Sequence, residues 1–123
     1  GTQALADSAP GRWFTPDFVR AHPDRVREIQ AVLAATSPEG YAACCEALAH
    51  SDLRADLGRI TVPSLLIAGA FDPVTTVADA HAMQAAIVHA RIDVLQASHL
   101  SNLEVPQMFT SAVLQFLARV SRA

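Results

Sequence analysis

Two short loops of this chain carry an acid and an imidazole, the side chains of general acid–base chemistry. Residues 69–75 (GAFDPVT) contain Asp72, and residues 97–104 (ASHLSNLE) contain His99. A carboxylate that accepts the Nδ1 proton of a histidine fixes the tautomer of the ring and stabilises the imidazolium that forms. The other ring nitrogen can then serve as a general base toward a nucleophile. We therefore interpret Asp72 and His99 as two catalytic residues of a triad.

Each loop directly follows a predicted β-strand. Residues 64–69 (SLLIAG) are a short apolar run that ends in glycine, which is typical of a strand buried on both faces of a parallel sheet. Residues 91–95 (RIDVL) form a second predicted strand. Because the carboxyl ends of parallel strands meet at one edge of a sheet, we expect Asp72 and His99 to lie within or near hydrogen-bond reach.

The order of the two loops along the chain favours a catalytic interpretation of Asp72 and His99. Taken singly, an aspartate before proline is most often a turn former, and a single histidine is most often a surface or core residue. In a triad built on such a sheet, a serine on a G-x-S-x-G turn precedes the acid, and the histidine comes last. The chain contains no such turn, since residues 36–40 (TSPEG) lack the first glycine and a preceding strand. We expect the nucleophile upstream of this chain.

Helices are predicted before the first strand and after each strand. Start signals of a hydroxyl or proline predict helices from Thr15, Pro23 and Ser37, and a shorter helical piece is expected over residues 53–57. Residues 1–11 show no clear period and are expected to be a loop or the tail of a helix begun upstream. The order is therefore helices followed by a βαβα unit, which is an α/β fold.

The predicted sheet is too small to be complete. Parallel sheets are covered on both faces and usually contain several strands, so two parallel strands do not make a stable fold. We expect the missing strands from an upstream segment or from another chain. A small α+β domain that is complete in itself is the alternative.

Composition excludes several functions. Half of the residues (51%) are hydrophobic and 17% are charged, which is typical of a globular protein. The net charge of -3 argues against a nucleic-acid partner, and no apolar run is long enough to span a membrane. Cys44 and Cys45 are adjacent and cannot bridge comfortably, so we expect two packed thiols in a reducing, cytoplasmic location.

Several stretches carry a resemblance to a known family. Residues 62–69 (VPSLLIAG) with Asp72 and Pro73 resemble the acid-bearing strand and turn of the α/β-hydrolase superfamily. Residues 12–15 (RWFT), 40–45 (GYAACC) and 99–104 (HLSNLE) resemble, more narrowly, the 3-oxoadipate enol-lactonase family. The resemblance covers nearly the whole chain and identifies it as the C-terminal half of such a hydrolase.

The resemblance implies a division of labour and a reaction. Residues 1–60 would be a helical cap, and residues 61–123 the C-terminal βαβα part of the hydrolase core. Asp72 would be the triad acid and His99 the base in hydrolysis of a lactone to 3-oxoadipate, in the β-ketoadipate route of aromatic catabolism. No metal or organic cofactor is needed. Arg12 and Trp13 are expected to bind the substrate, whose free carboxylate suits an arginine.

Three expectations concern partners and alternatives. The partners are a small lactone or ester, together with the N-terminal half of the enzyme or a second copy of the chain. Because it lacks a nucleophile, the chain alone is predicted to be inactive. An esterase or haloperoxidase-like hydrolase is the alternative enzyme hypothesis, and a non-catalytic interaction domain is the alternative hypothesis outside the enzymes.

Overall fold

The structure is a computed structural model that describes residues 2–122, and it divides into two compact units. The first extends to Leu53 and the second begins at Arg54. The division therefore lies a few residues before the predicted boundary at residue 60, and whether the first unit acts as a cap stays a prediction. None of the described helices is long and apolar enough to cross a membrane.

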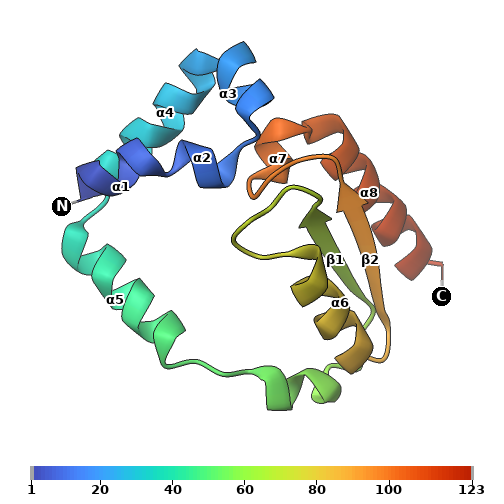
Figure 1. Cartoon of the computed structure of the whole chain (residues 1–123). Coiled ribbons are helices and arrows are strands. Elements are labelled where there is room, and N and C mark those ends of the chain that lie inside the picture. Colours follow the sequence, from blue (N-terminus) through green and yellow to red (C-terminus); the bar gives the residue numbers. More distant parts are fainter. Residues whose placement is uncertain (1, 123) are drawn as a thin grey trace. The chain divides into compact units, whose positions relative to one another are not determined.

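The first unit is entirely helical within the described residues (Figure 1). Its helices are α1 (Thr2–Ser8), α2 (Pro10–Trp13), α3 (Pro16–Ala21), α4 (Pro23–Ala34) and α5 (Pro38–Ala49). The predicted start signals are confirmed at α3 and α5, where the side chains of Thr15 and Ser37 accept hydrogen bonds from Phe18 N and Gly40 N. Residues 2–8 form a helix, in line with the helical alternative for this segment.

A small apolar core joins α1 to α4. Ala6, Ala9 and Leu33 are buried together, and Trp13 and Tyr41 pack against them while remaining partly exposed. Helix α5 buries none of its residues, and Cys44 and Cys45 are exposed free thiols. The expectation that these two cysteines pack as small apolar groups is therefore wrong for the described structure, because the helix face that carries them lies outside this core.

The second unit holds a two-stranded parallel sheet. Strands β1 (Ser64–Gly69) and β2 (Ala90–Leu95) pair in register from Ser64 opposite Ala90 to Gly69 opposite Leu95. Its helical elements are the 3-10 helix η1 (Arg54–Arg59), α6 (Val77–Ala86), α7 (Ser101–Glu104) and α8 (Pro106–Val120). The predicted α/β order is confirmed, whereas the short helix α7 was not expected from the sequence.

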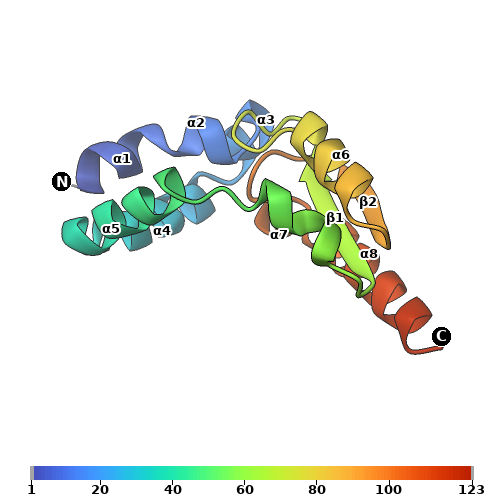
Figure 2. The ribbon, with the colours of Figure 1, turned by 90° about the horizontal axis from the view of Figure 1, so that it is seen from below.

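Helices cover both faces of this sheet. Figures 1 and 2 show α6 on one face and α8 on the other, which is the layering that a βαβ unit with a closing helix produces. Helix α6 begins at a capping box, because the Thr76 side chain accepts from Asp79 N while the Asp79 carboxylate accepts from Thr76 N. This well-defined start fixes where the loop after β1 ends.

Candidate active site

The parallel register places the two candidate catalytic loops side by side. Gly69, the last residue of β1, lies opposite Leu95, the last residue of β2, so both strands end level at the same edge of the sheet (Figure 1). Asp72 follows three residues after β1, and His99 follows four residues after β2. Strand pairing thus brings together two residues that are 27 positions apart.

Backbone hydrogen bonds continue from the sheet into the loops. Ala70 N donates to Leu95 O at 2.8 Å, and Phe71 N donates to Ala97 O at 3.0 Å. The two loops approach so closely at Gly69 that a Cβ atom there would lie 2.4 Å from Ser98 O. A residue without a side chain is therefore needed at the end of β1.

Asp72 and His99 are directly hydrogen-bonded. His99 Nδ1 lies 2.9 Å from Asp72 Oδ2, with the aspartate side chain 4% exposed and the histidine side chain 30% exposed. The acid is therefore shielded, while the imidazole remains open to solvent on part of its surface. This is the arrangement in which a carboxylate orients an imidazole and leaves Nε2 for proton transfer.

The Asp72 carboxylate accepts further hydrogen bonds from its own loop. Oδ1 accepts from the backbone N–H groups of Val74 at 2.7 Å and Thr75 at 3.1 Å, and Oδ2 accepts from the Thr75 hydroxyl at 2.8 Å. Burial acts to raise the pKa of Asp72, but the hydrogen bonds from His99, Val74 and Thr75 outweigh it. The net pKa lies below the ordinary value, so Asp72 is ionised at neutral pH.

The loop that carries His99 is closed by a second carboxylate. Glu104 Oε2 accepts from Ser98 N at 2.8 Å, across the turn that contains His99, and Ser98 itself is 2% exposed. Sequence reasoning missed a role for both Thr75 and Glu104. In the sequence, Thr75 stood out only as the last residue of the loop 69–75, and Glu104 only as part of the family-like stretch 99–104.

Arg12 and Trp13 belong to the first unit, whereas the acid–base pair belongs to the second. Arg12 is exposed at the end of α2, and Trp13 is partly buried against the alanines of α1 and its following turn. Trp13 thus has a structural role in the first unit. Its contact with substrate, like that of Arg12, stays a prediction.

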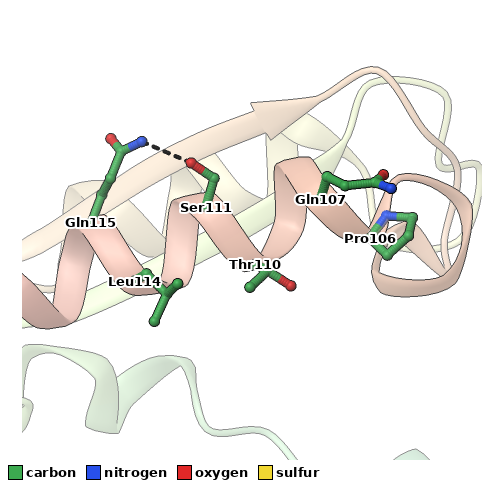
Figure 3. Close-up of a pocket in the computed structure, with 6 residues that line it drawn as sticks. All are labelled: Pro106, Gln107, Thr110, Ser111, Leu114 and Gln115. Atoms are coloured by element: carbon green, nitrogen blue, oxygen red, sulfur yellow. Dashed lines mark hydrogen bonds between the residues drawn. The ribbon is translucent and has the colours of Figure 1, made fainter.

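The other histidines and the surface pocket on α8 are not part of the site formed by Asp72 and His99. The remaining histidines are exposed (His22, His50, His81 and His89). A surface pocket on α8 is lined by Pro106, Gln107, Thr110, Ser111, Leu114 and Gln115 (Figure 3). It contains neither Asp72 nor His99, and no titratable side chain lines it.

The chain has an acid after one parallel strand and a histidine after the next, and helices cover both faces of the sheet. These features define part of an α/β-hydrolase fold. The chain is an α/β-hydrolase portion related to 3-oxoadipate enol-lactonase. It is 52% identical over 113 residues to 3-oxoadipate enol-lactonase 2 of Acinetobacter baylyi, covering 92% of this chain and 42% of that protein. No family model matches the chain.

Solved structures agree with this relationship. The enol-lactonase from Burkholderia xenovorans matches with a TM-score of 0.94 and 42% identity, over 96% of this chain and 45% of that one. A thermophilic esterase from Thermogutta terrifontis matches with a TM-score of 0.90 and 27% identity, over 98% of this chain and 45% of that one. The chain therefore spans less than half the length of the proteins that it resembles.

Proposed function

We propose that this chain is the acid- and histidine-bearing part of a serine hydrolase that opens a lactone or carboxylic ester. The observation that carries the proposal is the 2.9 Å hydrogen bond between Asp72 Oδ2 and His99 Nδ1 at the carboxyl ends of two parallel strands. Asp72 holds the imidazole in the tautomer with a proton on Nδ1, and Nε2 takes the proton of the attacking serine.

The proposed substrate is the enol-lactone of 3-oxoadipate. Its support is the 52% identity to the Acinetobacter enol-lactonase and the 42% identity to the Burkholderia enol-lactonase. The serine attacks the ring carbonyl, the ring C–O bond breaks, and the released enol tautomerises to a ketone. Water then releases the acyl group as 3-oxoadipate and restores the serine, with His99 moving the proton in each half-reaction. These steps need no cofactor.

The serine comes from a segment outside the 123 residues, the N-terminal half of the enzyme. A second copy of this chain could pair with the edge of β1 but has no G-x-S-x-G turn to supply the nucleophile. Strand β1 supports this view, because within residues 2–122 it pairs only with β2 and its residues from Ser64 to Ile67 are only half-buried. A strand this apolar gains from a second neighbour. We refer to this chain together with the serine-bearing segment as the complete hydrolase.

The test compares the purified chain with the complete hydrolase. The chain alone is expected to show no hydrolysis of the enol-lactone above background, because losing a triad nucleophile costs on the order of 10⁶ in rate. Light scattering should show the chain associating rather than remaining a stable monomer. Rapid lactone hydrolysis by the chain alone, or a cooperatively melting monomer, would contradict the proposal.

Substitutions in the complete hydrolase test the two roles. His99→Ala is expected to lower kcat nearly as much as loss of the serine, and Asp72→Asn by about 10⁴, because the wrong tautomer is then favoured. The exposed His89→Ala is the matched control and should leave kcat unchanged. A His99→Ala variant that keeps most of its activity would remove His99 from the mechanism.

Arg12 and Trp13 are proposed to recognise the substrate. The guanidinium of Arg12 can bind the free carboxylate of the lactone through two hydrogen bonds. Arg12→Gln should therefore raise KM for the enol-lactone more than for a neutral ester, and Trp13→Leu should weaken binding of both. An equal effect of Arg12→Gln on the two substrates would contradict carboxylate recognition.

General esterase activity is the second candidate, supported by the match to the Thermogutta esterase. The ratio of kcat/KM for the enol-lactone to that for p-nitrophenyl acetate separates the two. A ratio far above one supports the lactonase, and a ratio below one supports the esterase.

The exposed free thiols of Cys44 and Cys45 support our proposal that the protein works in the reducing cytoplasm.

A further inference from the structure

Thr75 lies at the meeting point of the acid and the histidine. Its hydroxyl donates to Asp72 Oδ2 at 2.8 Å, and the same carboxylate oxygen lies 2.9 Å from His99 Nδ1. Thr75 Oγ1 and His99 Nδ1 are 3.4 Å apart. The hydroxyl, the carboxylate oxygen and the imidazole nitrogen therefore form a triangle in which each atom contacts the other two.

The two oxygens of the Asp72 carboxylate are held differently. Among the described residues, Oδ1 accepts from the backbone N–H groups of Val74 and Thr75, and replacing Thr75 by valine or serine leaves both donors in place. Oδ2 accepts from His99 and from the Thr75 hydroxyl. Within the acid's own loop, as far as the structure describes it, this hydroxyl is the donor that keeps Oδ2 facing the imidazole while His99 gives and takes protons.

The neighbouring hydroxyl is engaged elsewhere. The Thr76 hydroxyl donates to Asp79 Oδ2 at 2.7 Å within the capping box of α6. Thr75 and Thr76 are adjacent and chemically identical, but one serves the acid and the other starts the helix. The function of Thr75 therefore has no substitute in the next residue.

We propose that Thr75 is a positioning residue that acts through Asp72, holding Oδ2 in line with His99 Nδ1. This inference rests on the proposed function, because it assigns Thr75 a part in the same acid–base pair. Without the hydroxyl, Asp72 keeps its hydrogen bonds at Oδ1, but Oδ2 then contacts only His99 among the described residues. His99 is itself the residue that Asp72 must orient. The imidazole is then aimed less well at the serine, while substrate binding is unaffected.

Kinetics of the complete hydrolase provide the first test. Thr75→Val should lower kcat about tenfold, which is the lower end of what one hydrogen bond to a charged group contributes, with KM within about twofold of the wild type. Thr75→Ser keeps a hydroxyl and should restore kcat to within about twofold. Thr110→Val is the matched control, because Thr110 is exposed on α8 and lines the pocket of Figure 3, whose lining includes neither Asp72 nor His99.

A double substitution shows whether Thr75 acts through Asp72. If it does, adding Thr75→Val to an Asp72→Asn enzyme should change kcat less than about twofold, because contacting residues of one network are not additive. A merely structural contribution would lower kcat tenfold in both backgrounds. Additive effects, or wild-type kinetics of Thr75→Val, would overturn the proposal.

A titration of the Asp72 carboxyl carbon by NMR separates this proposal from the proposed function, since it needs no activity. Among the described residues, the titratable groups that interact with Asp72 are His99 and, from α6, Asp79, and neither is substituted in these variants. Thr75→Val should raise the pKa of Asp72, whereas Thr75→Ser and Thr110→Val should not. An unchanged titration overturns the role of Thr75, while an inactive wild type with the expected titration overturns only the lactonase assignment.

Discussion

Replacing Gly69 by alanine should separate the two catalytic loops. The added Cβ would lie 2.4 Å from Ser98 O, 2.7 Å from Ala97 O and 2.9 Å from Ser98 C. All three atoms belong to the backbone of the loop that carries His99, so no side-chain rotation can relieve the contact. Either β1 or the His99 loop has to move.

The size of this movement follows from the distances. Ordinary contact between a methyl carbon and a carbonyl oxygen is about 3.4 Å, so Ser98 O has to retreat by about 1 Å. A displacement of about 1 Å can cost about 10² in rate, because the reacting groups lose their alignment. Overpacking at a buried position also costs about 1–3 kcal/mol of stability. We therefore expect Gly69→Ala to lower kcat of the complete hydrolase about 100-fold and to destabilise it by this amount.

The assay combines lactone kinetics, urea unfolding and a structure of the variant. Gly58→Ala is the matched control, because its added Cβ would meet only Ala86 O at 3.9 Å, an ordinary contact. That variant should change kcat less than about twofold. If Gly69→Ala retains wild-type kcat with the hydrogen bond between Asp72 and His99 intact, the close approach of the loops does not set the catalytic geometry.

Three further predictions concern stability of the complete hydrolase, each measured by urea unfolding. Because the pKa of Asp72 is lower in the folded state, its ionised carboxylate stabilises the fold at pH above the unfolded value near 4. This stabilisation is lost as pH falls through the folded pKa. The wild type should therefore lose more stability than Asp72→Asn from about pH 5 to about pH 3. Equal losses would show that Asp72 is not a source of acid sensitivity. Glu104→Ala removes the acceptor of Ser98 N and should cost about 1.5–3 kcal/mol, with Glu104→Gln costing less because its amide oxygen can still accept. Equal cost of the two variants would argue against the hydrogen bond. Thr76→Ala removes the cap of α6 and should cost about 1 kcal/mol, and a neutral effect would mean that the capping box does not contribute.

Sequence patterns predicted the second unit well. The apolar run ending at Gly69 and the strand ending at Leu95 are both present, and a helix follows each strand as predicted. These elements follow from local signals, since a short apolar run between turns specifies a buried strand and a proline start specifies a helix. The short helix α7 has neither a capping side chain nor a hydrophobic period, so no local sequence pattern predicted it.

Burial was predicted less well, because it depends on which elements meet. We expected Cys44 and Cys45 to be packed, and they share a helical spacing with Leu48. All three are exposed, however, and the core of the first unit is made by Ala6, Ala9 and Leu33 on other elements. A period shows which residues share a face of a helix. It does not show whether a second element covers that face.

By itself, the sequence determined that Asp72 and His99 lie at the ends of parallel strands, because strand order and loop position follow from local patterns. Only the tertiary structure decided how these side chains are held. The contact of Thr75 with the acid, the closure of the His99 loop by Glu104 and the close approach at Gly69 each join groups across a loop or between strands. Such contacts depend on strand register to within about an ångström, whereas a sequence pattern specifies only which residues face the same way.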